Sequence, residues 1–357
     1  MKGVDINRPE ILDFKRPDDR RRIAALRRKH YIRVVDDMEE QLRELAFVKR
    51  PKLLREGKKP AVKNDPTIGK WIYLPWKQAL VHLLDKKNYE RVRLSRNRDL
   101  ILPEEQAKFD RARIGIAGLN VGNPAAVCLA LEGGGNRMKL ADIDALSVSN
   151  LNRFRAGIGE LGINKVYISA HQAYEINPYA DITVYDTGIS RDTIDGFLSK
   201  PRIDVLVEEM DNLPLKILIR ERARHFRIPV VMVTGSGPDV VIDVERFDKS
   251  PNLPLLNGHL KQRVIEQSLS PDIRDYPFEK KIALARDFMG AEVLHPRLVK
   301  SFPLVGTTLA GIPQLAESSF LRGAAVTYVV RRIVTGKPMP SGRSVLRLEG
   351  VEKDSSK

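Results

Sequence analysis

The sequence predicts an α/β protein built on a doubly wound, mainly parallel sheet, with helical N-terminal and C-terminal extensions. Two observations support this prediction. Between residues 110 and 250, short apolar runs alternate with helical stretches, a pattern typical of parallel βαβ units. The strand-like runs, such as RIGIAG and IPVVMVTG, are rich in Ile and Val, as expected for strands covered on both faces. We therefore expect a Rossmann-type domain over residues 110–250.

Two modules are expected before this domain. In residues 1–62, apolar side chains between Asp18 and Lys49 recur every three or four positions, which predicts a basic helical extension. In residues 63–109, the motif WIYLPW precedes a helix that we expect to start near Lys77. Aromatic side chains of this kind usually anchor packing, so this module is expected to lead into the core.

The region after the domain is expected to be mostly helical. In residues 251–345, prolines divide the chain into short pieces, and FLRGAAVTYVVRRIVTG reads as one amphipathic helix ending at Gly336. This part completes the domain. Residues 346–357 are expected to form a disordered tail.

Composition is that of an ordinary folded protein and excludes several classes. Of the 357 residues, 42% are hydrophobic and 30% charged, and no apolar run reaches the roughly 18 residues of a membrane span. The single Cys128 excludes an internal disulfide and a thiolate zinc site, and a cytoplasmic protein is expected. The net charge is +15, and residues 1–63 hold 19 basic against 11 acidic residues. Interspersed acids favour a solvated face over nucleic-acid binding.

The turn after the first predicted strand is a candidate phosphate site. Residues 114–117 run into GLNVGNP, where Pro124 is expected to open a helix. Backbone amides and the helix dipole at such a turn attract phosphate. Gly118 and Gly122, on either side of Asn120, would let a ligand approach closely, although tight packing is the alternative reason for both glycines.

The second predicted strand ends in LADID, which contains Asp142 and Asp144. An acid at this position in Rossmann-type sites takes the ribose hydroxyls of a nucleotide. Asp142 lies about 24 residues after Gly118, as such a site requires. This spacing predicts a nucleotide site and leaves an adenylating enzyme and a dehydrogenase both open.

The segment VSNLNRFRAGIGELGINK separates these two classes. It carries Asn150, Arg153 and Lys165 directly after the predicted ribose site. A nicotinamide site does not need several cations there, whereas a triphosphate carries about four negative charges that must be neutralised as a bond breaks. The alternative is that Arg153 and Lys165 are ordinary surface charges.

The fourth predicted strand ends in VEEMDN, which places Asp211 and Asn212 at the carboxyl edge of the sheet, where such sheets bind ligands. The Asp211 carboxylate is a candidate Mg²⁺ ligand, since Mg²⁺ is usually held by one or two carboxylates and phosphate oxygens. Capping of the next helix by Asp211 or Asn212 is the competing role.

These motifs together resemble the ThiF/MoeB/HesA family of ubiquitin-activating-like adenylyltransferases. The resemblance runs in order through RARIGIAG, LADIDALSVSNLNR, GINK, EEMDN and IPVVMVTG, over about residues 95–248, and SNLNR is its most specific part. It is closest to a bacterial branch with a GL-x-VG turn and a WIYLPW-like module. The resemblance implies ATP and Mg²⁺ as cofactors and, as substrate, the C-terminal carboxylate of a ubiquitin-like protein or peptide.

The resemblance also implies roles for single residues. These are Asp142 on the ribose, Asn150 and Arg153 on the phosphates, Lys165 on the α-phosphate during transfer, and Asp211 on Mg²⁺. An arginine before the first strand reaches the ATP of the neighbouring subunit in this family. Arg98 is the better match and Arg96 the alternative, and a homodimer follows.

Two features depart from the family pattern. Asn120 and Val121 stand where the usual motif has glycines, which changes the grip on phosphate. Cys128 lies in the apolar run AAVCLALE, where burial as a small hydrophobe is expected, so no cysteine is available for a thioester. We therefore expect a bound acyl-adenylate that passes to an acceptor protein. A nicotinamide-dependent oxidoreductase, a non-catalytic nucleotide-binding scaffold and a nucleic-acid-associated protein remain as alternatives.

Overall fold

The computed structural model describes residues 8–348, which divide into two compact units. The first contains residues up to Ala107 together with Ala170–Ala180, and the second contains Lys108–Ser169 and residues from Asp181 onward. Residues 1–7 of the expected extension and 349–357 of the expected tail lie outside the described residues. No helix in the described part combines the length and apolar character that crossing a bilayer requires.

The first unit is built around a mixed sheet whose strand order, within residues 8–107, is β1-β3-β4-β2. The strands are β1 (Glu10–Leu12), β2 (Arg33–Asp36), β3 (Lys70–Leu74) and β4 (Ala79–Leu83). The helices and 3₁₀ turns are α1 (Pro17–Arg27), α2 (Met38–Lys49), α3 (Lys52–Arg55), η1 (Pro75–Lys77), α4 (Lys86–Arg93) and η2 (Ser95–Asn97), and α5 (Pro103–Arg111) crosses the boundary. α1 packs on the sheet through Ile23 and Leu26, which join the fully buried Trp71 in one cluster.

This unit corrects three expectations. The helical periodicity from Asp18 to Lys49 is interrupted by β2, which pairs in parallel with β4. The helix expected near Lys77 is instead β4, entered through Gln78 at φ 46°. Residues 1–62 and 63–109 are not separate modules, because β1 pairs with β3. In each case, pairing with a strand distant in sequence outweighs the local pattern.

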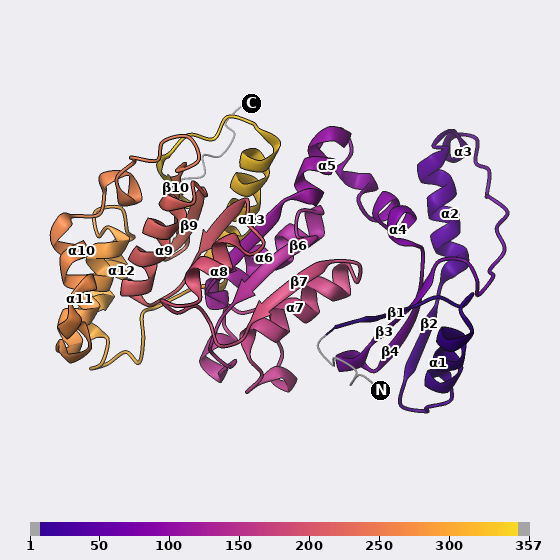
Figure 1. Ribbon diagram of the computed structural model, residues 1–357, viewed down its shortest axis with the longest axis horizontal. Coiled ribbons are helices and arrows are strands. Elements are labelled where there is room, and N and C mark those ends of the chain that lie inside the picture. The colour runs from indigo at the N-terminus through magenta and orange to yellow at the C-terminus, as the bar shows by residue number, and fades with distance from the viewer. Residues whose placement is uncertain (1–7, 349–357) are drawn as a thin grey trace, which may run out of the picture. The chain divides into compact units, whose positions relative to one another are not determined.

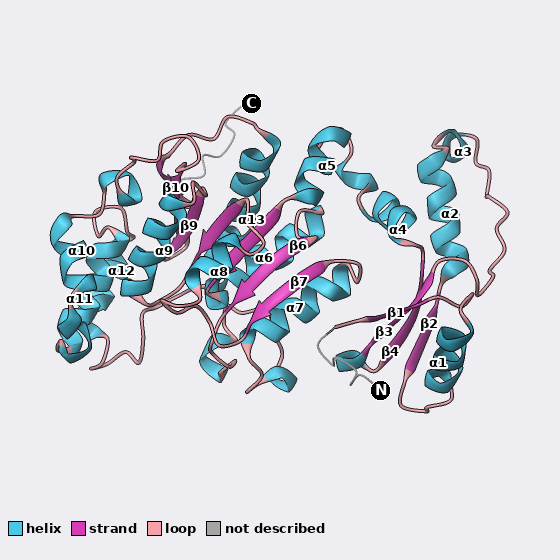
Figure 2. Cartoon of the chain, in the orientation of Figure 1, coloured by secondary structure: helices cyan, strands magenta, loops and turns pink. Residues whose placement is uncertain are grey.

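The second unit contains the predicted doubly wound sheet. Among residues 108–348 its strand order is β11-β10-β9-β8-β5-β6-β7, and the five strands from β9 to β7 are parallel. The strands are β5 (Arg113–Ala117), β6 (Arg137–Ala141), β7 (Asp181–Tyr185), β8 (Val205–Glu208), β9 (Val230–Ser236), β10 (Asp239–Glu245) and β11 (Gly342–Leu346). Figure 2 shows these strands lying between helices. The predicted fold class is confirmed.

Helices cover the two faces of this sheet. They are α6 (Leu119–Glu132), α8 (Ile194–Ser199), α9 (Leu213–His225), α10 (Gln262–Leu269), α11 (Phe278–Met289), α12 (Pro296–Ser301) and α13 (Ala316–Thr335). α7 (Lys165–Ile176) begins in this unit, and its residues from Ala170 onward belong to the first unit. The 3₁₀ turns are η3 (Val148–Asn150), η4 (Ile158–Glu160), η5 (Leu255–Gly258), η6 (Pro271–Asp275) and η7 (Phe302–Leu304). α6 packs against α13, whereas α8, α9, α10 and α11 share a buried cluster with the strands (Figure 1).

The C-terminal part agrees with the sequence in one respect and differs in another. α13 ends at Gly336, whose φ of 78° is left-handed, as predicted. β10 and β11, however, extend the sheet by antiparallel pairing that the sequence pattern did not predict. Leu346 pairs with Val240 and the Leu348 N–H donates to Asp239 Oδ1 at 2.9 Å. The expectation of a disordered tail is therefore wrong for residues 346–348.

Candidate functional site

A cavity of about 340 Å³ lies at the carboxyl edge of the parallel strands. Its lining comes from Gly118 and Asn120 after β5, residues 142–144 after β6, residues 187–189 after β7, and residues 209–212 after β8. The strand order reverses between β5 and β8, and this is where open α/β sheets bind ligands. Loops far apart in the sequence therefore converge on one cavity.

At both glycines of the turn, other atoms of the protein leave no room for a Cβ. Gly118 has a φ of 87°, and a Cβ there would lie 2.4 Å from the Glu209 carbonyl oxygen. A Cβ at Gly122 would lie 2.6 Å from Ile116 Cγ2. Gly118 still lines the cavity, but Gly122 does not belong to its lining, so helix-to-strand packing accounts for Gly122. Pro124 lies inside α6 and does not open that helix, which corrects the expected helix start.

Asp142 connects the ends of two strands. Its Oδ2 accepts the Leu119 N–H at 2.5 Å and its Oδ1 accepts the Asp144 N–H at 2.8 Å. Burial raises the pKa of Asp142, and these two backbone N–H groups oppose the rise. Each oxygen retains acceptor capacity, so a carboxylate already oriented by the backbone lines the cavity.

Lys165 and Arg153 are held within the protein rather than displayed on its surface. The Lys165 side chain is 5% exposed, and its Nζ lies 3.1 Å from Asp144 Oδ2 in the cavity lining. Arg153 is half-buried, and its Nη1 donates to the Ser149 carbonyl and to Asn152 Oδ1, each at 2.8 Å. Burial lowers the pKa of Arg153, and the Asp211 carboxylate opposes this.

Asn150 does not line the cavity. Its Oδ1 accepts hydrogen bonds from the backbone N–H and the hydroxyl of Ser147, each at 3.1 Å, and so closes the η3 turn. The structure therefore gives Asn150 a role in holding the loop that carries Arg153. Its expected contact with phosphate stays a prediction.

Asn212 and Asp211 differ in their surroundings. Asn212 caps α9, because its side chain accepts the Leu215 N–H at 3.1 Å, which is the competing role considered for this pair. Asp211 is exposed in the cavity lining and makes no hydrogen bond or ion pair with any of residues 8–348. Its carboxylate fits a cation held mainly by phosphate oxygens. The described residues contain no group of three ligands that would hold a metal unaided.

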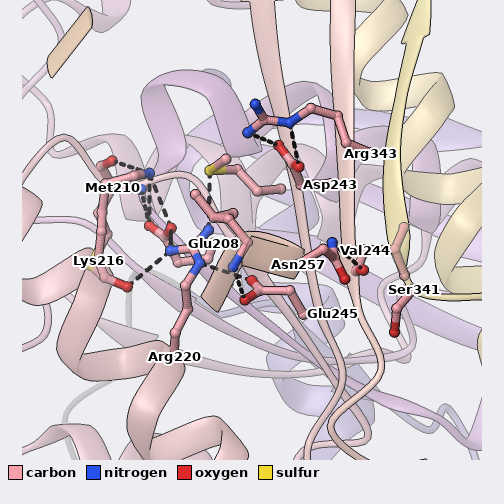
Figure 3. A network of polar contacts seen from close by, with 12 residues as sticks. Glu208, Met210, Lys216, Arg220, Asp243, Val244, Glu245, Asn257, Ser341 and Arg343 are labelled. Carbon is pink, nitrogen blue, oxygen red and sulfur yellow. Dashed lines mark hydrogen bonds and ion pairs between the residues drawn. The ribbon is translucent and has the colours of Figure 1, made fainter. Parts of the chain in front are cut away.

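A buried ion network fixes the loop that carries Asp211 (Figure 3). Glu208 accepts from Arg220 and lies 3.0 Å from Lys216 Nζ. Lys216 also donates to the Met210 carbonyl at 2.8 Å, while the Met210 N–H donates to Glu208 Oε1 at 2.9 Å. Lys216 and Arg220 hold the pKa of Glu208 below its usual range against the opposing effect of burial. The loop after β8 is thereby tied to α9.

Several cavity residues were not among the predicted site residues. Glu209 is buried and its Oε1 accepts the Val233 N–H at 2.8 Å, and burial raises its pKa to about 8. Ile143, Ile189 and Leu215 supply apolar walls. The signal for Ile189 was present, because it follows β7 and all parallel strands end at the same edge.

Arg98 and Cys128, which the sequence also singled out, do not line the cavity. Arg98 is exposed in the first unit and forms an isolated bridge with Ile101, so its role toward a neighbouring subunit stays a prediction. Cys128 is half-buried in α6, and burial raises the pKa of its thiol. A thiol of raised pKa is a poor nucleophile near neutral pH, as the sequence indicated.

The chain is similar to several known proteins. Residues 94–244 match the model of the ThiF family. The chain is 34% identical over 329 residues to an uncharacterized protein of Mycobacterium tuberculosis, covering 91% of this chain and 43% of that protein. It is 28% identical over 161 residues to tRNA threonylcarbamoyladenosine dehydratase of Escherichia coli, covering 43% of this chain and 59% of the relative.

A third relative is molybdopterin-synthase adenylyltransferase of Haemophilus influenzae, 26% identical over 164 residues and covering 44% of this chain and 65% of the relative. The chain thus spans less than two thirds of each of these curated relatives. The solved structure of the E. coli dehydratase matches with a TM-score of 0.50 at 19% identity, over 70% of this chain and 97% of that one. At this identity the match shows a shared fold.

Proposed function

Since residues 94–244 form a ThiF-family domain, we propose that this chain binds ATP and uses it to adenylylate a carboxylate. The observation that carries the proposal is the convergence of four strand ends on one cavity, with Lys165 paired to Asp144 of the cavity lining. The similarity to the molybdopterin-synthase adenylyltransferase of Haemophilus influenzae supports the same reaction class.

The roles proposed within the site follow from position. Asp142 takes the ribose hydroxyls, because its carboxylate is held at the end of β6 by two backbone N–H groups. The base lies against apolar side chains such as Ile189 and Leu215. Asn120 Oδ1 is buried without a hydrogen-bond partner, and a donor on the nucleotide would satisfy it.

The proposed reaction forms one bond and breaks one bond at the α-phosphorus. A carboxylate oxygen of the substrate attacks it, and the bond to the β-phosphate bridging oxygen breaks, releasing pyrophosphate. Lys165 and Arg153 stabilise the negative charge that develops on the phosphates. Mg²⁺ bound at Asp211 would supply further charge neutralisation when present.

The substrate and partners are also proposals. We infer the C-terminal carboxylate of a ubiquitin-like protein or peptide as substrate, a homodimer to which Arg98 contributes, and an acceptor protein for the acyl-adenylate. The raised pKa of Cys128 supports direct transfer without a thioester on this chain. The lone cysteine also supports the cytoplasm as the place of action.

The proposal is tested by mass spectrometry of the purified chain with Mg·ATP and candidate C-terminal peptides. We expect an AMP-linked peptide and one pyrophosphate per adenylate. Binding of ATP without turnover of any peptide would favour the scaffold instead. Stronger thermal stabilisation by NAD than by ATP would favour the oxidoreductase.

Lys165→Met tests the site directly. Removing this charge should lower ATP–pyrophosphate exchange about 10²- to 10³-fold, the usual effect of losing one such donor. Lys249→Met is the matched control, because Lys249 is an exposed lysine of the same unit. Circular dichroism checks that both variants are folded. Exchange by Lys165→Met within threefold of wild type would contradict the assigned role.

A further inference from the structure

Arg322 of α13 is a buried cation without a counter-charge in contact. The residue is 4% exposed. Its guanidinium makes one hydrogen bond with residues 8–348, from Nη2 to Gln314 Oε1 at the long distance of 3.4 Å. Its Nε is buried with no partner. No carboxylate of the described residues forms an ion pair with it.

Arg322 lies at the carboxyl edge of the parallel strands. A Cβ at Gly235, near the end of β9, would be 3.2 Å from the Arg322 Cζ. Burial lowers the pKa of Arg322, while the carboxylates of Glu209 and Asp211 oppose this from the cavity lining. The guanidinium therefore lies within electrostatic reach of the cavity.

The loop that carries Arg153 is attached to the beginning of the same helix. Asn152 Nδ2 donates to the Gln314 carbonyl at 3.0 Å, and Ser319 Oγ donates to the Arg153 carbonyl at 2.9 Å. Arg153 lowers the pKa of Arg322, so the two positive charges repel each other. Arg153 Nε is buried without a partner as well. Two arginines with unsatisfied Nε–H groups thus lie within electrostatic reach of each other.

Burying a guanidinium without a paired anion is unfavourable by several kcal/mol in a typical protein interior. A buried guanidinium is stabilised when an anion pairs with it. Its planar shape suits oxyanions that accept two parallel hydrogen bonds. We propose that Arg322, together with Arg153, binds an oxyanion of the reaction, either a phosphate of ATP or the carboxylate of the substrate. This inference rests on the proposed function only for the identity of the anion.

The test compares the full-length wild type with Arg322→Gln and Arg322→Lys. Mg·ATP and pyrophosphate are titrated by calorimetry, and acetate is tested by thermal shift on protein saturated with α,β-methylene-ATP, all at constant ionic strength. We expect Arg322→Gln to weaken at least one of these interactions about 10- to 100-fold. Lysine should restore it only in part, since it keeps the charge without the planar fork.

The pattern of losses identifies the anion. Weaker binding of ATP and pyrophosphate assigns Arg322 to a phosphate, whereas loss of acetate stabilisation alone assigns it to the carboxylate. Arg332→Gln is the control, because within the described part of the chain this arginine of α13 donates only to the Pro338 carbonyl. This substitution should leave all three interactions unchanged.

Two results would overturn the inference: a folded Arg322→Gln variant that matches wild type with all three probes, or a wild type that binds none of them. If Arg322→Gln does not fold, Arg322→Lys makes the same comparison. Pyrophosphate binding that depends on Arg322, without any adenylate formation, would contradict the proposed function and leave this inference standing.

Discussion

Arg220→Met should strongly destabilise the second unit, because Arg220 is the buried cation shared by two carboxylates. The side chains of Arg220 and Glu208 are 0% exposed and that of Glu245 is 1% exposed. Without Arg220, Glu208 keeps Lys216 at 3.0 Å. Among residues 8–348, Glu245 keeps only the Leu256 N–H, at 2.7 Å. Without Arg220, which lies beside it in Figure 3, Glu245 becomes a buried charge without a cation.

Breaking a buried pair by removing one partner costs about 3–5 kcal/mol, a large share of the roughly 5–15 kcal/mol that stabilises a typical domain. Burial already raises the pKa of Glu245 and Arg220 lowers it, so removing Arg220 raises that pKa further. A carboxyl whose folded pKa is raised binds its proton more readily when folded, and its contribution to stability falls as the pH rises. The deficit of Arg220→Met should therefore be larger at pH 8 than at pH 5.

Urea denaturation of wild type and variant at both pH values measures this deficit. Arg220→Met combined with Glu245→Gln is the matched control, because it removes the charge that the single change leaves unpaired. We expect the double variant to recover part of the lost free energy of unfolding, as coupled neighbours do. A single-variant deficit below about 1 kcal/mol, or one independent of pH, would refute the reasoning.

The remaining predictions concern Gly118 in the cavity lining and the buried Lys139. Gly118→Ala places a Cβ 2.4 Å from the Glu209 carbonyl oxygen at a φ of 87°, and should lower the free energy of unfolding by about 1–3 kcal/mol. Gly157→Ala is the control, because a Cβ there would have nothing within 4 Å. Equal denaturation midpoints for the two variants would contradict the prediction for Gly118. Lys139 is buried and its pKa is lowered to about 8, so wild-type stability should rise with pH above 8, where the unfolded chain binds more protons. Lys139→Met should remove that part of the rise, and identical pH dependences of the two denaturation midpoints would exclude it.

The parallel core was predictable because its signals are local. Each strand from β5 to β8 is a short run that contains apolar residues, and each is followed along the chain by a helix, in turn α6, α7, α8 and α9. Parallel strands joined by helices place all their carboxyl ends at one edge, so Asp142 and Asp211 were expected to meet there, and both line one cavity.

The first unit and the sheet edge were less predictable because their strands depend on distant partners. The sequence of β2 fits a helical pattern, and its strand conformation depends on pairing with β4. Likewise, β11 pairs with β10, which lies about 100 residues earlier in the chain. Arg322 was missed for a related reason. Within α13 it is one arginine of an amphipathic helix, and only its burial at 4% exposure marks it as unusual.

The sequence by itself determined the order of strands and helices in the core, and with it the edge at which acidic and basic side chains gather. That order follows from periodicity and from the need of parallel strands for crossovers. Only the tertiary structure decided how these side chains are used: Asn212 as a helix cap, Gly122 as a packing position, and Arg322 as a buried cation. Burial and hydrogen-bond partners depend on chain segments far apart in sequence, and they decide which charges are neutralised by the protein and which remain for a ligand.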